Sequence, residues 1–369
     1  MDKFQMRQSL LLLLTATIWG VAFVAQSVGM DYVGPLTFNC VRSLLGGAVL
    51  LPCIWLLDKY GGKHGPIGEE GRIGHEGKNG GQAEGRLQIG HEGKNGGQAE
   101  GRLQIGHEGK NGKQADRQLQ IGHEGKKRKQ ADRQLLAGGI ICGLLLCLAT
   151  NFQQVGIAYT TVGKAGFITA LYIVIVPVLG LFSHRKCRPL LWLGVFLALV
   201  GLYFLCMAGA GAQVTEGQVF PGIPIGKGDF LVFICALLFS GHILAIDHFT
   251  QRVDGVKMSC IQFWVCGLVS GVGMFLAEEP RLAEILMAWK PLLYAGVMSC
   301  GVAYTLQVVG QKGMDPTVAS LILSLESVIS VLAGLVVLGQ RLSWQETLGC
   351  ALMFAAIVLA QVAGKEKSA

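Results

Sequence analysis

The chain has 369 residues, of which 51% are apolar and only 15% are charged, and it contains 53 glycines. This composition is typical of a protein built from membrane-spanning helices rather than of a water-soluble domain. The formal net charge is +7. The basic residues fall mainly in loops on one side of the expected membrane, so the charge reports orientation and predicts no nucleic-acid partner.

Ten apolar segments of about 20 residues follow one another, each long enough to cross a hydrocarbon core of roughly 30 Å. We expect them at 8–28, 35–57, 135–157, 162–182, 190–208, 229–249, 258–277, 290–310, 316–338 and 345–363. The first is too long for a cleaved signal peptide, and no small-residue cleavage site follows it. The sequence therefore predicts an all-α polytopic membrane protein with ten transmembrane helices.

Residues 58–134 form an insertion made largely of four tandem units. The hexapeptide Ile-Gly-His-Glu-Gly-Lys that opens each unit begins at Ile73, Ile89, Ile105 and Ile121, a period of 16 residues. Gly, Gln, Lys and Glu dominate, and no apolar face supports a core, so we expect a disordered cytoplasmic loop. Each unit has one histidine followed by a glutamate: His75, His91, His107 and His123. Metal binding is the alternative interpretation, but tandem duplication produces this spacing by itself.

The second five segments repeat the first five. Gly20 and Gly34 precede Gly241 and Gly255 by 221 positions. The residues that recur after 154 positions are Gly156, Ala165, Ile168 and Leu171, which match Gly310, Ala319, Ile322 and Leu325. The offset falls by 67 because only the first half carries the insertion. We therefore assign 1–57 with 135–208 to one repeat and 229–363 to the other.

Five helices is an odd number, so the second repeat enters the membrane from the opposite side. Inverted repeats are the architecture of secondary transporters, which bind their substrate near the midplane between the repeats. With a cytoplasmic N-terminus, 25 of the 31 Lys and Arg residues lie on the inner side and four lie outside. The positive-inside rule therefore places both termini in the cytoplasm.

Ionisable and polar side chains inside the spans are the candidate site residues, because such groups are costly in a membrane. Glu326 lies at the centre of the span 316–338, and its counterpart 154 positions earlier is Tyr172. Both are expected to face a central cavity. The alternatives are a protonated helix-to-helix hydrogen bond for Glu326 and an ordinary core position for Tyr172.

Other candidates lie at other depths of the spans. We expect Trp19 and His242 to line the cavity, although a lone histidine often only hydrogen-bonds a neighbour. Arg42 and Lys164 are expected to attract an anionic group at the outer vestibule. Gln154 and Gln307 belong with them to a wider set of polar residues that could line alternating vestibules, whose other members are Gln26, Asn39, Asn151, Gln153, Asp247, His248, Gln262, Tyr304 and Lys312. Snorkelling to water is the alternative for Lys164, Asp247 and His248.

The sequence contains no phosphate-binding loop, no zinc-ligand spacing and no nucleophile elbow. Its eleven cysteines are scattered singly, without a Cys-x-x-Cys pair, so packing is the expected role of each. We therefore expect no cofactor, no metal and no enzymatic activity, and an ion or solute gradient as the source of energy.

Several motifs carry a family resemblance. They are Trp19-Gly20, the run from Gly34 to Arg42, the run from Lys164 to Tyr172, the run from Ala319 to Glu326, and Leu338 to Leu342. Together they resemble the bacterial drug/metabolite transporter superfamily, EamA type. The resemblance implies two five-helix repeats, a central cavity lined by the first, third and fourth helices of each, and export of metabolites or amino acids. The family's usual Gly-Glu-Arg is Gly339-Gln340-Arg341 here, and its short loop is replaced by 58–134.

The sequence thus predicts a secondary transporter, expected to export small metabolites or amino acids across a bacterial inner membrane by alternating access. Proton coupling and a homodimer are further expectations. The alternative is a non-transporting membrane sensor or scaffold that uses the repeat loop to bind a cytosolic partner.

Overall fold

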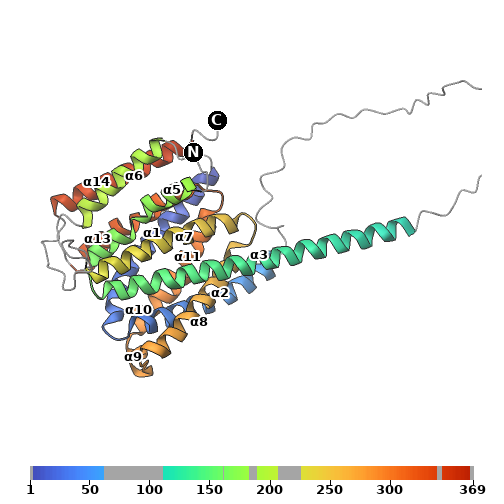
Figure 1. Cartoon of the computed structure of the whole chain (residues 1–369), viewed down its shortest axis with the longest axis horizontal. Coiled ribbons are helices and arrows are strands. Elements are labelled where there is room, and N and C mark those ends of the chain that lie inside the picture. Colours follow the sequence, from blue (N-terminus) through green and yellow to red (C-terminus); the bar gives the residue numbers. More distant parts are fainter. Residues whose placement is uncertain are drawn as a thin grey trace, which may run out of the picture. The chain divides into compact units, whose positions relative to one another are not determined.

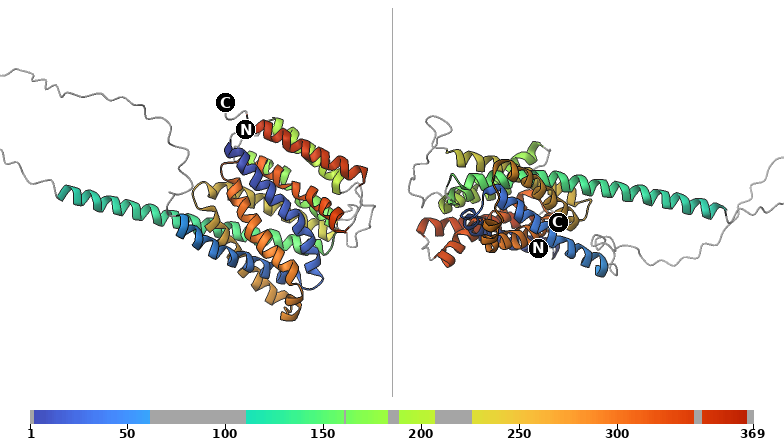
Figure 2. Two further views of the ribbon diagram at one scale, coloured as in Figure 1. Left: turned by 180° about the vertical axis from the view of Figure 1, so that it is seen from behind. Right: turned by 90° about the horizontal axis from the view of Figure 1, so that it is seen from below.

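The computed structural model describes residues 3–61, 111–160, 162–182, 189–206, 226–338 and 343–365, nearly all of them in helices (Figure 1). Two compact units are distinguished, one made of Met1–Trp55 with Gln130–Ala369 and the other of Leu56–Lys129. The first unit is a bundle of helices that lie side by side in both views of Figure 2. The candidate site lies within this unit.

A helix, continuous or interrupted, covers each segment that the sequence predicts to cross the membrane. The elements are α1 (Lys3–Met30), α2 (Pro35–Gly61), α3 (Asn111–Ile157), α4 (Val162–Thr169), α5 (Tyr172–Phe182), α6 (Pro189–Cys206), α7 (Lys227–Thr250), α8 (Gly255–Ala277), α9 (Leu282–Met287), α10 (Trp289–Leu293), the π-helix η1 (Tyr294–Ala303), α11 (Tyr304–Gln311), α12 (Pro316–Leu323), α13 (Leu325–Leu338) and α14 (Trp344–Lys365).

Six helical stretches are long and apolar enough to cross a membrane: Lys3–Met30, Pro35–Lys59, Lys129–Ile157, Lys227–Thr250, Gly255–Ala277 and Trp289–Gln311. Four shorter apolar helices accompany them: Tyr172–Phe182, Pro189–Phe204, Pro316–Ser330 and Thr347–Leu359. Within an α-helix the backbone N–H and C=O groups hydrogen-bond to one another, as a hydrocarbon environment requires. The lengths and apolar composition of these helices confirm the prediction of an all-helical polytopic membrane protein.

The helix α3 begins well before the span that the sequence predicts. Of the insertion expected to be disordered, residues 58–61 end α2, residues 62–110 lie outside the described residues, and residues 111–134 are helical. The described helical part falls in the last two of the four 16-residue units, which contain three and two glycines where the first two contain five each. Each glycine costs a helix about 1 kcal/mol relative to alanine, so the low glycine content of these two units favours the helix.

Two membrane segments are interrupted near their middles. The regular α-helical hydrogen-bond pattern is interrupted between α4 and α5 at Ala170 and Leu171, and between α12 and α13 at Ser324, where the backbone angles stay right-handed (φ −61°, ψ −13°). The Ser324 hydroxyl donates to the carbonyl oxygen of Leu321 at 2.8 Å, and the Ser320 hydroxyl donates to that of Thr317 at 2.9 Å. Hydroxyl groups that bond to the preceding turn in this way compete with the helix ladder and bend it.

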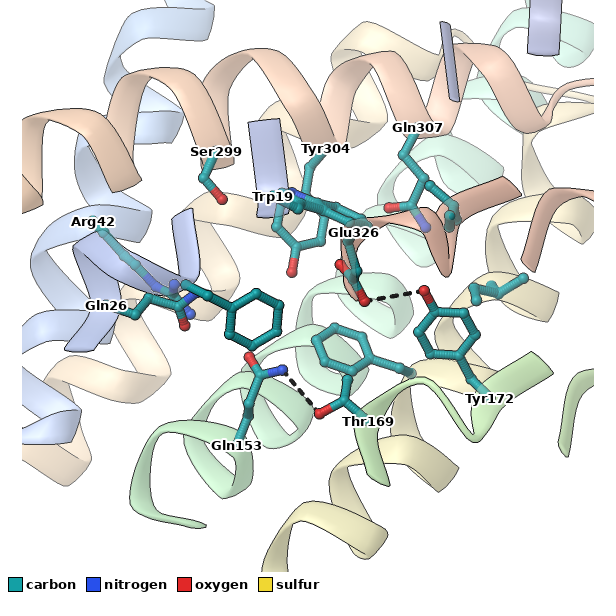
Figure 3. Close-up of a pocket in the computed structure, with 14 residues that line it drawn as sticks. Trp19, Gln26, Arg42, Gln153, Thr169, Tyr172, Ser299, Tyr304, Gln307 and Glu326 are labelled. Carbon is teal, nitrogen blue, oxygen red and sulfur yellow. Dashed lines mark hydrogen bonds between the residues drawn. The ribbon is translucent and has the colours of Figure 1, made fainter. Parts of the chain in front are cut away.

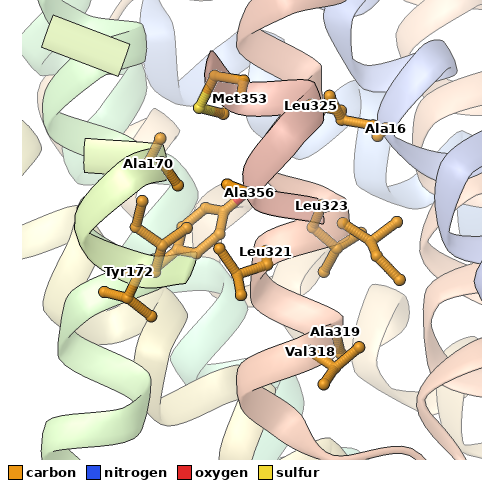
Figure 4. Packing of buried hydrophobic residues seen from close by; sticks show 14 of the residues in the cluster. Ala16, Ala170, Tyr172, Val318, Ala319, Leu321, Leu323, Leu325, Met353 and Ala356 are labelled. Atoms are coloured by element: carbon orange, nitrogen blue, oxygen red, sulfur yellow. The ribbon is translucent and has the colours of Figure 1, made fainter. Parts of the chain in front are cut away.

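Both interruptions are held in one apolar core. Buried residues of α1, α5, α6, α7, α12, α13 and α14 form this core, which includes Ile173, Leu202, Leu321 and Met353. Figure 4 shows Tyr172 from one interrupted segment beside Leu321 from the other. α6 also packs along α14 (Figure 1). The core therefore fixes the positions of the two helix breaks relative to each other.

The start of α2 is capped by a distant residue. Glu278, which follows α8, accepts hydrogen bonds from the amides of Leu36 and Thr37, both at 2.8 Å, and from the Thr37 hydroxyl at 2.6 Å. A carboxylate at a helix N-terminus satisfies free amides and complements the helix dipole. By contrast, α8 is capped locally, since Asp254 accepts from the Lys257 amide at 2.9 Å.

Close helix contact at Gly20 yields a prediction on stability. A Cβ atom there would lie 2.6 Å from the Ile329 Cβ and 2.8 Å from the Glu326 carbonyl oxygen, neither of which can move alone. We expect Gly20→Ala to lower the free energy of unfolding by about 1–3 kcal/mol, as overpacking does. Thermal unfolding in detergent measures the change. Gly166→Ala is the control, because nothing lies within 4 Å of its Cβ position, and it should leave stability unchanged or raise it.

Candidate functional site

A cavity lies where helices of both halves of the chain meet (Figure 3). The volume open to the centres of water molecules is about 40 Å³, whereas one water needs only about 10–15 Å³. Its lining residues are Trp19, Phe23, Gln26, Arg42, Gln153, Thr169, Tyr172, Phe239, Ile243, Ser299, Tyr304, Gln307, Leu323 and Glu326. The cavity therefore has room for a few waters or for polar groups of a small solute, between aromatic and polar walls.

Glu326 and Tyr172 meet at the two helix interruptions. The Tyr172 hydroxyl donates to the Glu326 Oε1 at 3.1 Å, and both side chains are buried. Tyr172 is the first residue of α5, and Glu326 is the second residue of α13. The two interruptions thus place the starts of α5 and α13 beside the same cavity. Each of these starts contributes one polar side chain to the lining. This pair joins residues that are 154 positions apart, the offset of the sequence repeat.

Arg42 is a buried cation on the α2 wall. Only 3% of its surface is exposed, and its Nε atom has no hydrogen-bond partner among the residues that the structure describes. Its guanidinium carbon lies 5.6 Å from the centre of the Phe38 ring, close enough for a cation–π contact. Among the described residues no carboxylate pairs with it. A buried charge without a counter-charge is costly, so Arg42 can gain free energy by binding an anionic group.

Further polar atoms around the cavity also lack a hydrogen-bond partner in the part of the chain that the structure describes. They are the Trp19 Nε1, the Gln26 Oε1 and the Gln307 Oε1. Because more than 90% of buried polar groups are hydrogen-bonded in folded proteins, several orphans around one cavity indicate a place for water or a polar ligand. Figure 3 shows Gln26 with Arg42 on one side of the cavity and Gln307 with Glu326 and Tyr172 on the other.

Aromatic rings form the remaining walls. Trp19 on α1 and Tyr304 on α11 are in contact, with ring centres 4.5 Å apart and planes tilted by 56°. Phe263, which is not one of the lining residues, packs edge-on against Tyr304 with 5.4 Å between ring centres. Phe23 and Phe239 also line the cavity. Such walls can bury the apolar part of a solute and can face a cation with the π-surface of a ring.

The structure brings together five of the eight candidates from the sequence. Trp19, Arg42, Tyr172, Gln307 and Glu326 all line the cavity. They come from α1, α2, α5, α11 and α13, so the cavity gathers residues from both ends of the chain.

The other three candidates are not among the lining residues. His242 is buried behind Tyr304, with ring centres 6.3 Å apart, and its Nε2 lies 3.2 Å from the Gln262 Oε1. The Gln154 amide donates to the carbonyl oxygen of Gln26 at 3.4 Å. The Lys164 side chain lies outside the described residues. His242 and Gln154 are therefore placed as neighbours of the wall rather than parts of it.

Three more lining residues, Gln26, Gln153 and Tyr304, belong to the wider set of polar candidates from the sequence. Gln153 lines the cavity whereas Gln154 does not, and it donates to the Thr169 hydroxyl at 3.3 Å. Successive helix residues point about 100° apart, so a choice between adjacent glutamines needs the rotation of α3. Ser299 and Thr169 line the cavity but are not among the candidates, and polarity inside a span is the signal that both carry.

Metal chemistry finds no support in the part of the chain that the structure describes. Over these residues, no group of three or more His, Cys, Asp or Glu side chains is arranged to hold a metal ion. Glu326 is the only carboxylate among the lining residues. The arrangement is suited to binding a small polar solute through charge, hydrogen bonds and ring faces.

Known proteins match both the sequence and the fold. The model of the EamA-like transporter family matches residues 6–67 and 226–361, together more than half of the chain. An uncharacterized transporter from Archaeoglobus fulgidus is 28% identical over 228 residues, which cover 60% of this chain and 67% of the relative. A protein of known crystal structure is 16% identical and covers 98% of this chain and 99% of its own, with a TM-score of 0.64. At that identity the structural match concerns the fold.

The unpaired charge of Arg42 yields a prediction on stability. We expect Arg42→Gln to raise the free energy of unfolding without substrate by up to about 3 kcal/mol, since an intramembrane arginine is costly. Thermal unfolding in lipid nanodiscs measures the change. In the control Arg281→Gln, the exposed 3.6 Å pair with Glu284 is lost, and surface pairs contribute only about 0–1 kcal/mol. A large loss of stability in Arg42→Gln would show that Arg42 is already stabilised by the protein.

Proposed function

Because the chain belongs to the EamA-like transporter family, a family of transporters and not of enzymes, we propose that it is a gradient-driven secondary transporter of small amphoteric solutes. The observation that carries this proposal is one cavity that contains an unpaired Arg42 and the carboxyl group of Glu326. The membrane transporter assignment follows from the family and from the apolar helices. Substrate class, coupling and direction are our inferences.

The proposed architecture is ten transmembrane helices in two inverted repeats, 1–57 with 135–208 and 229–363, separated by the insertion 58–134. Helix bounds support it beyond the sequence offsets. α12 begins and ends 154 positions after α4, which runs from Val162 to Thr169. The interruption that follows each of them recurs at the same offset. Two unrelated segments would have no reason to break at matching positions, so a duplicated five-helix unit accounts for them.

The substrate is proposed to carry a negative and a positive group on an apolar body, as an amino acid does. Its carboxylate would pair with the Arg42 guanidinium, which has donors to spare. Its ammonium would approach Glu326, beside the faces of Trp19 and Tyr304. Since these groups line a single cavity, one small molecule can use both charges. A solute with only one charge would leave the other protein charge buried and unpaired.

Coupling is proposed to use the carboxyl group of Glu326. A proton or a substrate ammonium can neutralise its negative charge, and a hydrocarbon environment disfavours the bare carboxylate. The protonated form of Glu326 and the form paired with the substrate ammonium would therefore alternate, so that the substrate leaves as a proton binds. Tyr172 holds the carboxyl group in place through the 3.1 Å hydrogen bond. In this scheme the inverted repeats expose Glu326 first to one side of the membrane and then to the other.

The membrane is proposed to be a bacterial cytoplasmic membrane, with both termini inside and with export as the direction of transport. The excess of Lys and Arg on the side of the termini supports this orientation. A homodimer remains part of the proposal. Apolar side chains on α14 and α8, such as Phe354 at 67% and Phe275 at 74%, are exposed on the bundle surface and suit contact with lipid or with a second copy.

The first test measures proton movement. In sealed liposomes with a pH-sensitive dye inside, we expect wild-type protein to move protons when an amino acid panel is offered on one side. Glu326→Gln should abolish proton movement, because an amide cannot exchange the proton, while substrate exchange persists. Glu284→Gln, a change at an exposed carboxylate, is the control. Equal proton flux in Glu326→Gln would overturn the coupling role, and absence of flux with every solute would favour the sensor or scaffold.

The second test concerns charge recognition. Wild-type protein should prefer an amino acid over its methyl ester by about tenfold or more, equivalent to about 1.4 kcal/mol, because the ester cannot pair with Arg42. Competition against a radiolabelled substrate measures this ratio. Arg42→Gln should lose the preference through weaker binding of the acid, whereas Arg281→Gln should keep it. A preference that survives in Arg42→Gln would assign the carboxylate to another residue.

A further inference from the structure

A cluster of thiols, hydroxyls and amides lies where α2, α3 and α8 meet, and none of its members lines the cavity. Cys147 on α3 and Cys266 on α8 are its centre, and they are 2% and 1% exposed. The Asn151 amide donates to the Cys147 Sγ at 3.3 Å. On the other side, the Ser43 hydroxyl lies 3.3 Å from the Cys266 Sγ. The transport scheme above makes no use of these groups.

The contacts of the two cysteines are reciprocal across the α3–α8 interface. The Cys147 Sγ lies 3.4 Å from the Ser270 hydroxyl, one turn beyond Cys266 on α8. The Cys266 Sγ lies 4.0 Å from the Thr150 hydroxyl, one turn beyond Cys147 on α3. Each sulfur thus lies near the turn of the opposite helix that follows the other cysteine.

The helices approach unusually closely one turn before this pair. A Cβ atom on Gly143 of α3 would lie 2.7 Å from the Val265 Cβ and 2.8 Å from the Gln262 carbonyl oxygen of α8. Gly139, one turn earlier still, would meet the Ile261 side chain at 2.5 Å. A disulfide requires Cβ atoms about 3.5–4.5 Å apart. Larger side chains at a helix crossing hold the Cβ atoms of the two helices farther apart than this distance. Glycine at the crossing lets the helices approach closely enough to reach it.

We propose that Cys147 and Cys266 form a reversible disulfide that ties α3 to α8 and stops the transport cycle. In this reaction the two thiols lose two protons and two electrons as the sulfur–sulfur bond forms. Hydrogen peroxide takes these up and becomes two molecules of water, and an azo oxidant such as diamide becomes a hydrazine. The thiolate is the attacking form, and the amide of Asn151 with the hydroxyls of Ser43 and Ser270 can hydrogen-bond negative charge on sulfur.

The lock follows from where the two helices belong. In the proposed architecture α3 is in the first repeat and α8 is in the second, and alternating access moves one repeat against the other. A covalent bond between them holds the bundle in one state. This consequence rests on the proposed transport function, whereas the disulfide itself does not.

Peptide mapping tests the disulfide. The full-length chain in liposomes is treated with diamide, free thiols are alkylated, and the digest is analysed by mass spectrometry with and without reductant. We expect a reductant-sensitive link between the peptides that contain Cys147 and Cys266, with the loss of two alkylatable thiols. Cys142→Ser, another buried cysteine of α3, should keep the link, and Cys147→Ser should lose it. If Cys147 and Cys266 of the oxidised wild-type protein are both still alkylated, the proposed disulfide is overturned. This outcome is read from the wild-type protein alone.

Substrate exchange by the same liposomes tests the lock. We expect oxidation to remove exchange in the wild type and in Cys142→Ser, reductant to restore it, and Cys266→Ser to remain active under oxidation. If peptide mapping finds the disulfide but substrate exchange is unchanged after oxidation, the proposal that the disulfide stops transport is overturned. A reduced protein that carries no solute counts against the proposed transport function instead, and the peptide map still decides whether the thiol pair exists.

Discussion

The structure depends on a carboxyl group that cannot be left alone in an apolar bundle. Glu326 is 6% exposed, and its one hydrogen bond in the described structure comes from Tyr172. Both side chains stand at the starts of helices that follow the two interruptions, α5 and α13. The cavity lies beside this pair, and both residues line it. The polar pair, the two interruptions and the cavity therefore occur together in the bundle.

Buried polar groups elsewhere in the bundle hold helices together. The Asn39 amide nitrogen donates to the Asn151 Oδ1 at 2.8 Å and to the Thr150 carbonyl oxygen at 3.0 Å, which joins α2 to α3. Such bonds between helices stabilise a membrane bundle. Buried polar atoms without a partner among the described residues occur around the cavity, at Arg42, Trp19 and Gln307, and also away from it, as at the Asn39 Oδ1. The cavity is distinguished because its unpartnered atoms belong to residues that line a space large enough for water.

Sequence patterns predicted the helices and the opposition of Glu326 to Tyr172, because long apolar runs and a repeat offset are visible without tertiary information. They did not predict which face of a helix points inward. Lipid and protein core are both apolar, so a membrane helix lacks the polar stripe that orients a soluble one. For that reason the sequence does not decide between the adjacent Gln153 and Gln154, nor whether His242 reaches the cavity. The early start of α3 follows from differences in glycine content between the tandem units, which their shared period hides.

The cap on α2 bears on the order in which the protein is made. The amides of Leu36 and Thr37 bond to a residue 242 and 241 positions later in the chain, whereas α8 and α12 are capped by their own Asp254 and Asp315. While the ribosome is still synthesising the first half, Glu278 does not yet exist. The second half can therefore cap these helices as it emerges, but α2 reaches its final form only after most of the chain has entered the membrane.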